Sequence, residues 1–249
     1  MTVLFLFFIA GLFIGSFLNV CIYRLPREES ILYPPSHCPT CKHPLKPWNL
    51  VPLLSYIWQR GRCSHCAGKI SLRYPMVELV TGLLFAFCYW RYDSLDYGAA
   101  AAIFAAFLLV ITYIDYDYQL ILDKVLLCLS AAGFIIEIVL VHLDWIDFCV
   151  GPLLGGGVLL LLAIISRGGM GGGDVKFAAV LGLWLGIKGV ILMLFLAFLL
   201  GGFIGIVLLA LGRKGRKDAI PFGPFMAVAA LITWLYGADL LAWYFGMVL

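Results

Sequence analysis

The chain has 249 residues, of which 63% are hydrophobic and only 12% charged, with a formal net charge of +3 at pH 7. An average soluble domain carries about 25% charged residues, so the chain has too little polar material to cover a surface exposed to water. These proportions exclude a soluble enzyme, a disordered chain and a disulfide-rich secreted module. The mild net charge does not predict a nucleic-acid partner. The class of protein that fits this composition is a polytopic membrane protein.

Eight apolar runs are candidates for membrane-spanning helices, since a spanning helix needs about 20 mostly apolar residues. They cover residues 2–22, 76–92, 97–115, 120–141, 146–166, 175–187, 189–211 and 220–247. The sixth run is short, and its separation from the seventh depends on a break at Gly186. The sequence therefore predicts an all-α polytopic membrane protein with about eight transmembrane helices in a lipid bilayer.

Residues 24–75 differ from the rest of the chain, because they combine many charges and prolines with four of the eight cysteines. We interpret this segment as a folded loop outside the bilayer. Three parts are expected: a first transmembrane helix at 1–23, a cytoplasmic four-cysteine loop at 24–75, and a transmembrane core of about seven helices at 76–249.

The basic residues predict the orientation in the membrane. If the 24–75 loop is cytoplasmic, alternation of the helices places Lys124 and the segments 167–176 and 213–217 on the same side. Only Arg91 and Lys188 of the 17 basic residues are then outside. The positive-inside rule therefore predicts that both termini lie outside the cytoplasm. The first run should stay as a helix, since its positive charges follow it, unlike those of a cleavable signal.

Four cysteines form two CxxC pairs, Cys38 with Cys41 and Cys63 with Cys66. Two such pairs are typical of zinc ribbons, in which four thiolates close a tetrahedral shell. A reducing cytoplasm argues against disulfides. Because a closed shell leaves no position for an activated water, we expect a structural zinc ion that folds a loop too small to bury its own core. A catalytic zinc ion is the alternative.

Two acidic residues lie within or at the end of predicted spans: Asp115, and Asp174 after three glycines. A carboxylate there is costly, so each is a candidate functional residue. The predicted topology places both at the cytoplasmic boundary. Two carboxyls held close together cannot both ionise easily, and they share a proton. An aspartyl protease uses this arrangement: one carboxylate activates water while its protonated partner polarises the scissile carbonyl.

A second interpretation of these acids stays open on the sequence alone. Asp115 and Asp117 would anchor a helix end at the interface, and Asp174 would be an ordinary charge at a helix N-terminus. Asp117 is also a rival of Asp115 for the catalytic role. We expect Asp123 to be solvated at the membrane surface.

Several segments, in order along the chain, resemble the bacterial type IV prepilin peptidases, including those of type II secretion and competence systems. The matching segments are Gly15–Pro26, the four cysteines, Asn49–Pro52, Arg60–Cys63, Ile70–Glu78, the Asp115 segment, Gly169–Lys176 of GxGD type, and Pro221–Phe225. One departure is Leu122, which stands where the family has the proline of a Leu-Pro-Asp run. Its loss removes a fixed turn, but the carboxylate of Asp123 is present, and we still expect activity.

The resemblance implies a bifunctional membrane enzyme of the GxGD aspartyl protease type. Its substrates are expected to be prepilins or pseudopilins, whose short basic leader is cut at the cytoplasmic face of the bacterial inner membrane. The new amino terminus is then expected to be N-methylated with S-adenosylmethionine. Carried over residue by residue, the resemblance makes Asp115 and Asp174 the catalytic pair.

The methyl-transfer site is not located by a known fingerprint. No glycine-rich Rossmann motif is present, so a pocket of another kind is expected. Asn19, Arg73 and Glu78 are polar residues near the cytoplasmic ends of the first two helices, and they are our candidates. The alternative is that they are ordinary interfacial anchors.

Two other classes of protein compete with the peptidase. A transporter or channel would fit eight spans with embedded acids, but the four-cysteine loop and the paired aspartates disfavour it. A membrane zinc metalloprotease would need a ligand set such as HExxH, and the sequence has none.

Overall fold

A computed structural model describes residues 1–38, 40–141, 144–166, 169–212 and 220–248. Within them the chain is helical, and its β-structure consists of two isolated bridges, His37 with Pro44 and Arg62 with Lys69. The predicted all-α class is confirmed. Arg167 and the basic segment 213–217, which contribute to the predicted orientation, lie outside the described residues.

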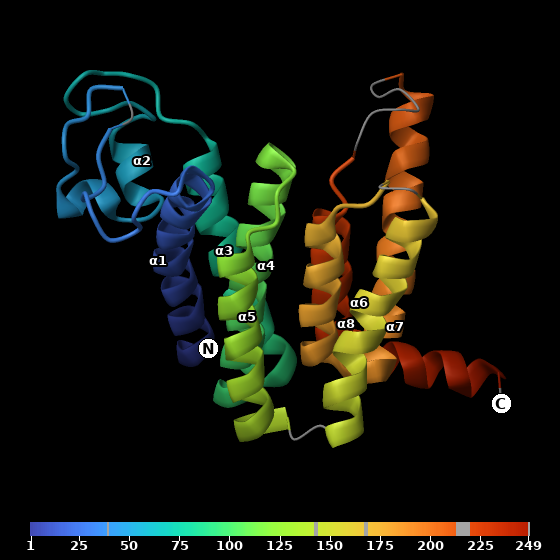
Figure 1. Cartoon of the computed structure of the whole chain (residues 1–249). Coiled ribbons are helices and arrows are strands. Elements are labelled where there is room, and N and C mark those ends of the chain that lie inside the picture. The colour runs from blue at the N-terminus through green and yellow to red at the C-terminus, as the bar shows by residue number, and fades with distance from the viewer. Residues whose placement is uncertain (39, 142–143, 167–168, 213–219, 249) are drawn as a thin grey trace. The chain divides into compact units, whose positions relative to one another are not determined.

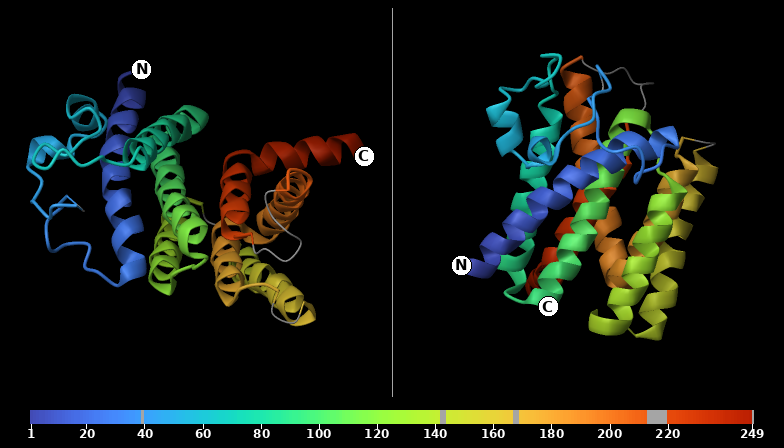
Figure 2. Two further views of the ribbon diagram at one scale, coloured as in Figure 1. Left: turned by 90° about the horizontal axis from the view of Figure 1, so that it is seen from above. Right: turned by 90° about the vertical axis from the view of Figure 1, so that its left-hand side faces the viewer.

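The chain divides into two compact units, Met1–Ala106 and Phe107–Leu249. In the first unit, α1 (Thr2–Arg24) packs against α3 (Arg73–Tyr92), as Figure 1 and Figure 2 show. A glycine permits this contact, because a Cβ at Gly15 would lie 2.8 Å from the Cα of Glu78. Small residues at such interfaces let membrane helices approach closely.

The segment between α1 and α3 has little regular structure. It contains two 3₁₀ helices, Leu25–Arg27 and Pro47–Leu50, and the short helix α2 (Leu54–Trp58). Figure 1 shows this segment gathered at the end of α1 where α3 begins.

The second unit is built around α7. It contains the second half of α4 (Leu95–Tyr118), then α5 (Asp123–Ile136) with a π-helical continuation at Glu137–Val141, α6 (Trp145–Ile165), α7 (Gly172–Ala210) and α8 (Gly223–Val248). α7 contacts α5, α6 and α8. The indole Nε1 of Trp184 donates a buried hydrogen bond of 3.0 Å to the carbonyl oxygen of Leu129, which joins α7 to α5.

The long helix α7 is interrupted at Gly186. Its φ of 65° and ψ of −173° are not helical and belong to a region of backbone space that is essentially restricted to glycine. In Figure 1 the two halves of α7 run in opposite directions. The predicted break at Gly186 is therefore confirmed.

Six described helices are long and apolar enough to cross a membrane, by length and composition. Eight separate spans are not confirmed, because two of the predicted runs share α7 and α3 is not among the six. The helices also present apolar side chains outward: Leu153, Leu161 and Ile165 of α6 are 72%, 61% and 76% exposed. Such a face suits contact with lipid and not with water, so the chain is a multi-pass membrane protein.

Candidate active site and metal site

Asp115 lies in the last turn of α4 and is buried, with only 5% of its surface exposed. Its Oδ2 accepts a hydrogen bond of 2.9 Å from the backbone N–H of Gly223, the first residue of α8. The first N–H groups of a helix have no partner within that helix, and they favour a negative charge nearby. The start of α8 thus gives the Asp115 carboxylate a fixed donor.

Asp174 lies in the first turn of α7 and is half-buried. Its Oδ2 accepts a hydrogen bond of 3.2 Å from the N–H of Gly171. A Cβ at Gly173 would lie 3.0 Å from the Cβ of Ile121, so this glycine allows the start of α7 to approach the chain that follows α4. Asp174 and Asp115 interact electrostatically. The structure therefore brings the two predicted acids together within one unit.

The two rival acids are placed differently. Asp117 and Asp123 are exposed. The Nζ of Lys176 lies 2.9 Å from both carboxylate oxygens of Asp123, and both side chains of this pair are largely exposed to solvent. Exposed ion pairs contribute little to stability. Of these four acids, Asp115 is buried and Asp174 half-buried, whereas Asp117 and Asp123 are exposed.

Leu122 does not disturb the turn in which the family has a proline. It caps the N-terminus of α5 with a φ of −81° and a ψ of 125°. Proline fixes φ near −65 ± 15°, so Leu122 adopts a backbone conformation close to the one that proline would impose. α5 accordingly begins at Asp123 without the proline.

Gly223→Ala should impair any reaction that depends on Asp115. An added Cβ would lie 2.6 Å from the Oδ2 of Asp115, so either the carboxylate or the start of α8 must move. Misplacing a reacting group by about 1 Å can lower a rate by about 100-fold. In steady-state kinetics of prepilin cleavage, kcat should fall by about this factor while KM changes little.

Gly246→Ala is the matched control for this prediction, because Gly246 lies in the same helix and an added Cβ there meets nothing within 4 Å. The control should cut prepilin at the wild-type rate. An unchanged kcat for Gly223→Ala would show that this contact does not position Asp115.

The four cysteines of the two CxxC pairs come together between α1 and α3. Their sulfurs all lie within 4.8 Å of one another. In a tetrahedral shell with Zn–S bonds of about 2.3 Å, the sulfurs are about 3.8 Å apart, and the Sγ atoms of Cys38 and Cys66 are 3.9 Å apart. The donor set and its spacing fit one four-coordinate metal ion.

The two CxxC turns share two backbone hydrogen bonds. The N–H of Cys38 donates to the carbonyl oxygen five residues later, and the N–H of Lys42 donates back to the carbonyl oxygen of Cys38; the turn at Cys63 repeats both bonds. Lys42 and Ala67 hold the equivalent position in the two turns, with φ of 58° and 55°. This conformation costs a residue other than glycine about 1–2 kcal/mol, which the binding of an ion would offset.

The cysteine thiols are unequal in acidity. Backbone N–H groups of Cys41 and Thr40 lower the pKa of the Cys38 thiol from 9.0 to about 6, against the opposing effect of burial. At Cys66 the N–H of Gly68 lowers the pKa, but interactions with the other three sulfurs and burial outweigh it and raise the pKa to about 11. Of these two thiols Cys38 loses its proton more readily, and a bound cation would favour the thiolate form of Cys66.

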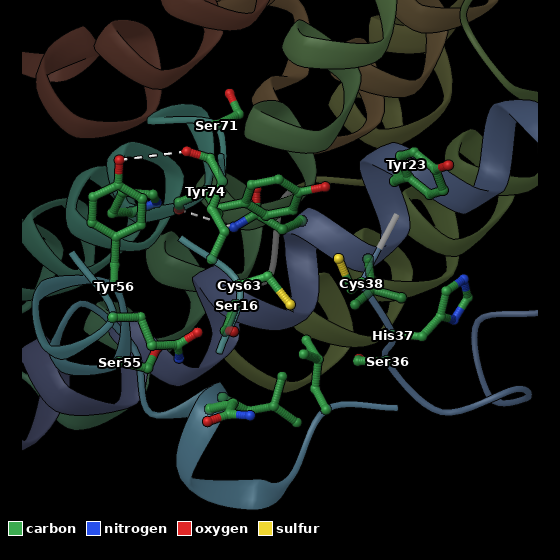
Figure 3. Close-up of a pocket in the computed structure, with 18 of the residues that line it drawn as sticks. Ser16, Tyr23, Ser36, His37, Cys38, Ser55, Tyr56, Cys63, Ser71 and Tyr74 are labelled. Atoms are coloured by element: carbon green, nitrogen blue, oxygen red, sulfur yellow. Dashed lines mark hydrogen bonds between the residues drawn. The ribbon is translucent and has the colours of Figure 1, made fainter. Parts of the chain in front are cut away.

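Two of the three candidate methyl-transfer residues line one cavity of about 440 Å³ in the first unit, shown in Figure 3. Nδ2 of Asn19 donates a hydrogen bond of 3.1 Å to the carbonyl oxygen of Tyr74, and Oε2 of Glu78 accepts one of 2.9 Å from the N–H of Leu53. Arg73 is not among the described residues that line this cavity.

Two features of these sites were missed by sequence reasoning. One is Gly223 as the donor to Asp115, although a glycine next to Pro224 ahead of an apolar run does mark a helix start. The other is the set of tyrosines in the cavity, Tyr23, Tyr56 and Tyr74. Nothing in their spacing could have indicated that they lie together.

Comparisons with known proteins agree over most of the chain. Residues 9–92 match the family described as Bacterial Peptidase A24 N-terminal domain, and residues 102–206 match the Type IV leader peptidase family. Three similar proteins, each named prepilin leader peptidase/N-methyltransferase, come from Bacillus subtilis, Aeromonas hydrophila and Neisseria gonorrhoeae. They are 34%, 36% and 34% identical, over 97%, 96% and 90% of this chain and 98%, 92% and 87% of their own lengths. No solved structure matches.

Proposed function

The chain belongs to the type IV leader peptidase family, and from this membership we propose that it removes the leader peptides of prepilins or pseudopilins and N-methylates the new amino terminus. The relatives that carry both activities in their names match it over most of their lengths. The structural observation that supports the proposal most is the pairing of buried Asp115 with Asp174 in one unit.

We propose Asp115 and Asp174 as the catalytic pair. The charged member takes a proton from water as the water oxygen bonds to the scissile carbonyl carbon, and the protonated member donates a hydrogen bond to the carbonyl oxygen. The C–N bond then breaks while the amine nitrogen takes up a proton from the pair. The N–H of Gly223 holds the Asp115 carboxylate in place for this chemistry.

We further propose that the protein lies in the bacterial inner membrane, with this site at the cytoplasmic face. Asp115 is at the end of one spanning helix and Asp174 at the start of another, so both carboxyls lie at helix ends and not in mid-membrane. A prepilin has an apolar helix in the bilayer and a basic leader in the cytoplasm, which places its scissile bond at the same boundary. The positive-inside pattern of the sequence supports this orientation.

For the four-cysteine cluster we propose a structural Zn²⁺ bound by Cys38, Cys41, Cys63 and Cys66. Four thiolates complete a tetrahedral shell and leave no open position for water or substrate. The ion would contribute folding free energy to a segment with little apolar core of its own, and the residues of the segment do no chemistry through it.

One experiment tests both proposed activities. Purified protein is incubated with a prepilin and S-adenosylmethionine, and the masses of the products are measured. We expect the loss of the leader, followed by the gain of one methyl group at the new amino terminus. A prepilin of unchanged mass would contradict the peptidase, cleavage without methylation would contradict the transferase, and cleavage that stops at once on brief chelation would favour a metalloprotease.

A further inference from the structure

The cavity of the first unit is enclosed by three parts of the chain. The C-terminal half of α1 contributes Asn19 and Tyr23, the start of α3 contributes Tyr74 and Glu78, and the segment between these helices contributes the remaining wall, including Tyr56. Figure 3 shows the tyrosine rings and the sulfur atoms of Cys38 and Cys63 around it. Its volume of about 440 Å³ is within the range of small-molecule sites, about 300–1,000 Å³.

A fixed carboxylate lies on one wall of this cavity. Glu78 is only 9% exposed, and its Oε2 is held by the N–H of Leu53 at 2.9 Å. Ser16 provides a further side-chain hydrogen bond to it. A carboxylate that is buried and oriented in this way, without a basic side chain among these partners, attracts a cation from outside the protein.

Positively charged side chains also line the cavity. Lys69 and Arg24 are both among its lining residues. Arg24 is buried and donates a hydrogen bond of 2.8 Å to the carbonyl oxygen of Ser30, so it also ties the segment to α1. A ligand with separate positive and negative groups would find complementary charges here. The guanidinium of Arg27 already lies over the ring of Tyr23, so the rings of Tyr56 and Tyr74 are the aromatic surfaces that would suit a flat ring and a desolvated cation.

We propose that this cavity is the S-adenosylmethionine site, an inference that rests on the methyl-transfer activity proposed above. Glu78 faces the positively charged groups of the ligand, the tyrosines line the adenosyl portion, and Lys69 and Arg24 face the ligand's carboxylate. The bound ligand supplies an electrophilic methyl group. The residues fit this group in size, charge and ring surface, although no Rossmann motif is present.

Glu78 would also serve the second substrate, the new amino terminus of the pilin. The new amino terminus would arrive as an ammonium group and first give one proton to Glu78, because only the neutral amine has the lone pair that can attack. The amine nitrogen would then form its bond to the methyl carbon while the bond from carbon to sulfur breaks and its electrons stay on sulfur. Because an ammonium group and a sulfonium group repel each other, a carboxylate between them lowers the cost of bringing the two reactants together.

The test measures binding and not turnover. Equilibrium dialysis of the purified full-length protein is carried out with S-adenosylmethionine and, separately, with S-adenosylhomocysteine, which lacks the sulfonium charge. Glu78→Gln keeps the size of the side chain and an oxygen for the N–H of Leu53. It should weaken S-adenosylmethionine binding about tenfold, the effect expected for losing one charge-assisted contact, and weaken S-adenosylhomocysteine binding much less.

Glu29→Gln is the matched control, because Glu29 is exposed and is not among the residues that line the cavity. It should bind both compounds as the wild type does. A second variant, Ser71→Trp, adds bulk at an exposed residue of the cavity wall. It should weaken the binding of both compounds to a similar extent. Ultraviolet cross-linking of methyl-labelled S-adenosylmethionine to the wild type should label peptides that line the cavity, within residues 16–24, 36–38, 40–59 or 63–78.

The outcomes separate the two proposals. If the wild type cuts prepilin but binds neither compound, the methyl-transfer activity itself is wrong, and this site fails with it. If the wild type binds S-adenosylmethionine but the label maps outside these peptides, the cavity is not the site. If Glu78→Gln weakens the binding of both compounds equally, or of neither, Glu78 does not recognise the positive charge of S-adenosylmethionine.

Discussion

Asp115→Asn and Asp174→Asn should each abolish leader cleavage, with the rate falling about a thousandfold or more. Asparagine has nearly the shape of aspartate, but it can neither take the proton of an attacking water nor lend a proton to the leaving amine. Because Asp115 is buried against the N–H of Gly223, the amide can still accept that hydrogen bond, so the loss would reflect chemistry and not unfolding. The measurement is the rate of leader release from purified prepilin.

Two exposed acids of the same region are the controls. Asp117→Asn and Asp123→Asn should retain substantial cleavage, since neither residue shares the buried site. The two catalytic variants should also still methylate a pre-cleaved pilin whose amino terminus is free, because that reaction needs no activated water. If Asp117→Asn were inactive while Asp115→Asn still cut prepilin, the catalytic residue at the end of α4 would be Asp117 and not Asp115.

Cys38→Ser or Cys63→Ser should release the metal ion and lower both the yield and the melting temperature of the protein. Structural zinc contributes about 10–16 kcal/mol of apparent binding free energy in small zinc-dependent folds, and a serine hydroxyl replaces a thiolate poorly as a ligand. The measurements are metal content by atomic absorption, with one zinc ion per chain expected in the wild type, and thermal unfolding in detergent.

Cys128→Ser and Cys149→Ser are matched controls, because both cysteines are exposed and neither belongs to the four-cysteine cluster. They should change neither metal content nor melting temperature. A Cys38→Ser protein that melts like the wild type, holds no metal and yet neither cuts nor methylates would overturn the structural role and favour a chemical one.

The sequence predicts the helices and the acidic candidates well, because both leave local signals. Apolar runs define α1, α4, α6 and α8, and a carboxylate such as Asp115 at the end of an apolar run is conspicuous by itself. The break at Gly186 was also predictable, since a glycine within a long apolar run permits backbone that other residues avoid. The number of spans is less well predicted, because the run at 76–92 forms α3, which is not among the six described helices that are long and apolar enough to cross a membrane.

The details of the sites depend on contacts between distant segments. The hydrogen bond from Gly223 to Asp115 joins residues far apart in the chain, and no periodic pattern links them. The same is true of the cavity, where Tyr56 of the cysteine-rich segment and Tyr74 of α3 line the same space. Leu122 shows the opposite case, in which the sequence suggested an altered turn and the backbone proved compatible with the usual one.

The central claim is that the two carboxyls act as one catalytic unit, and the double variant tests it most directly. Leader release is followed to completion, at high enzyme concentration, for Asp115→Asn, Asp174→Asn and the protein that carries both changes. The shared-proton mechanism predicts that all three proteins cut at nearly the same residual rate, because removing either carboxyl already removes the pair. The mechanism would be contradicted if the two losses multiplied, so that the double variant cut prepilin far more slowly than either single variant.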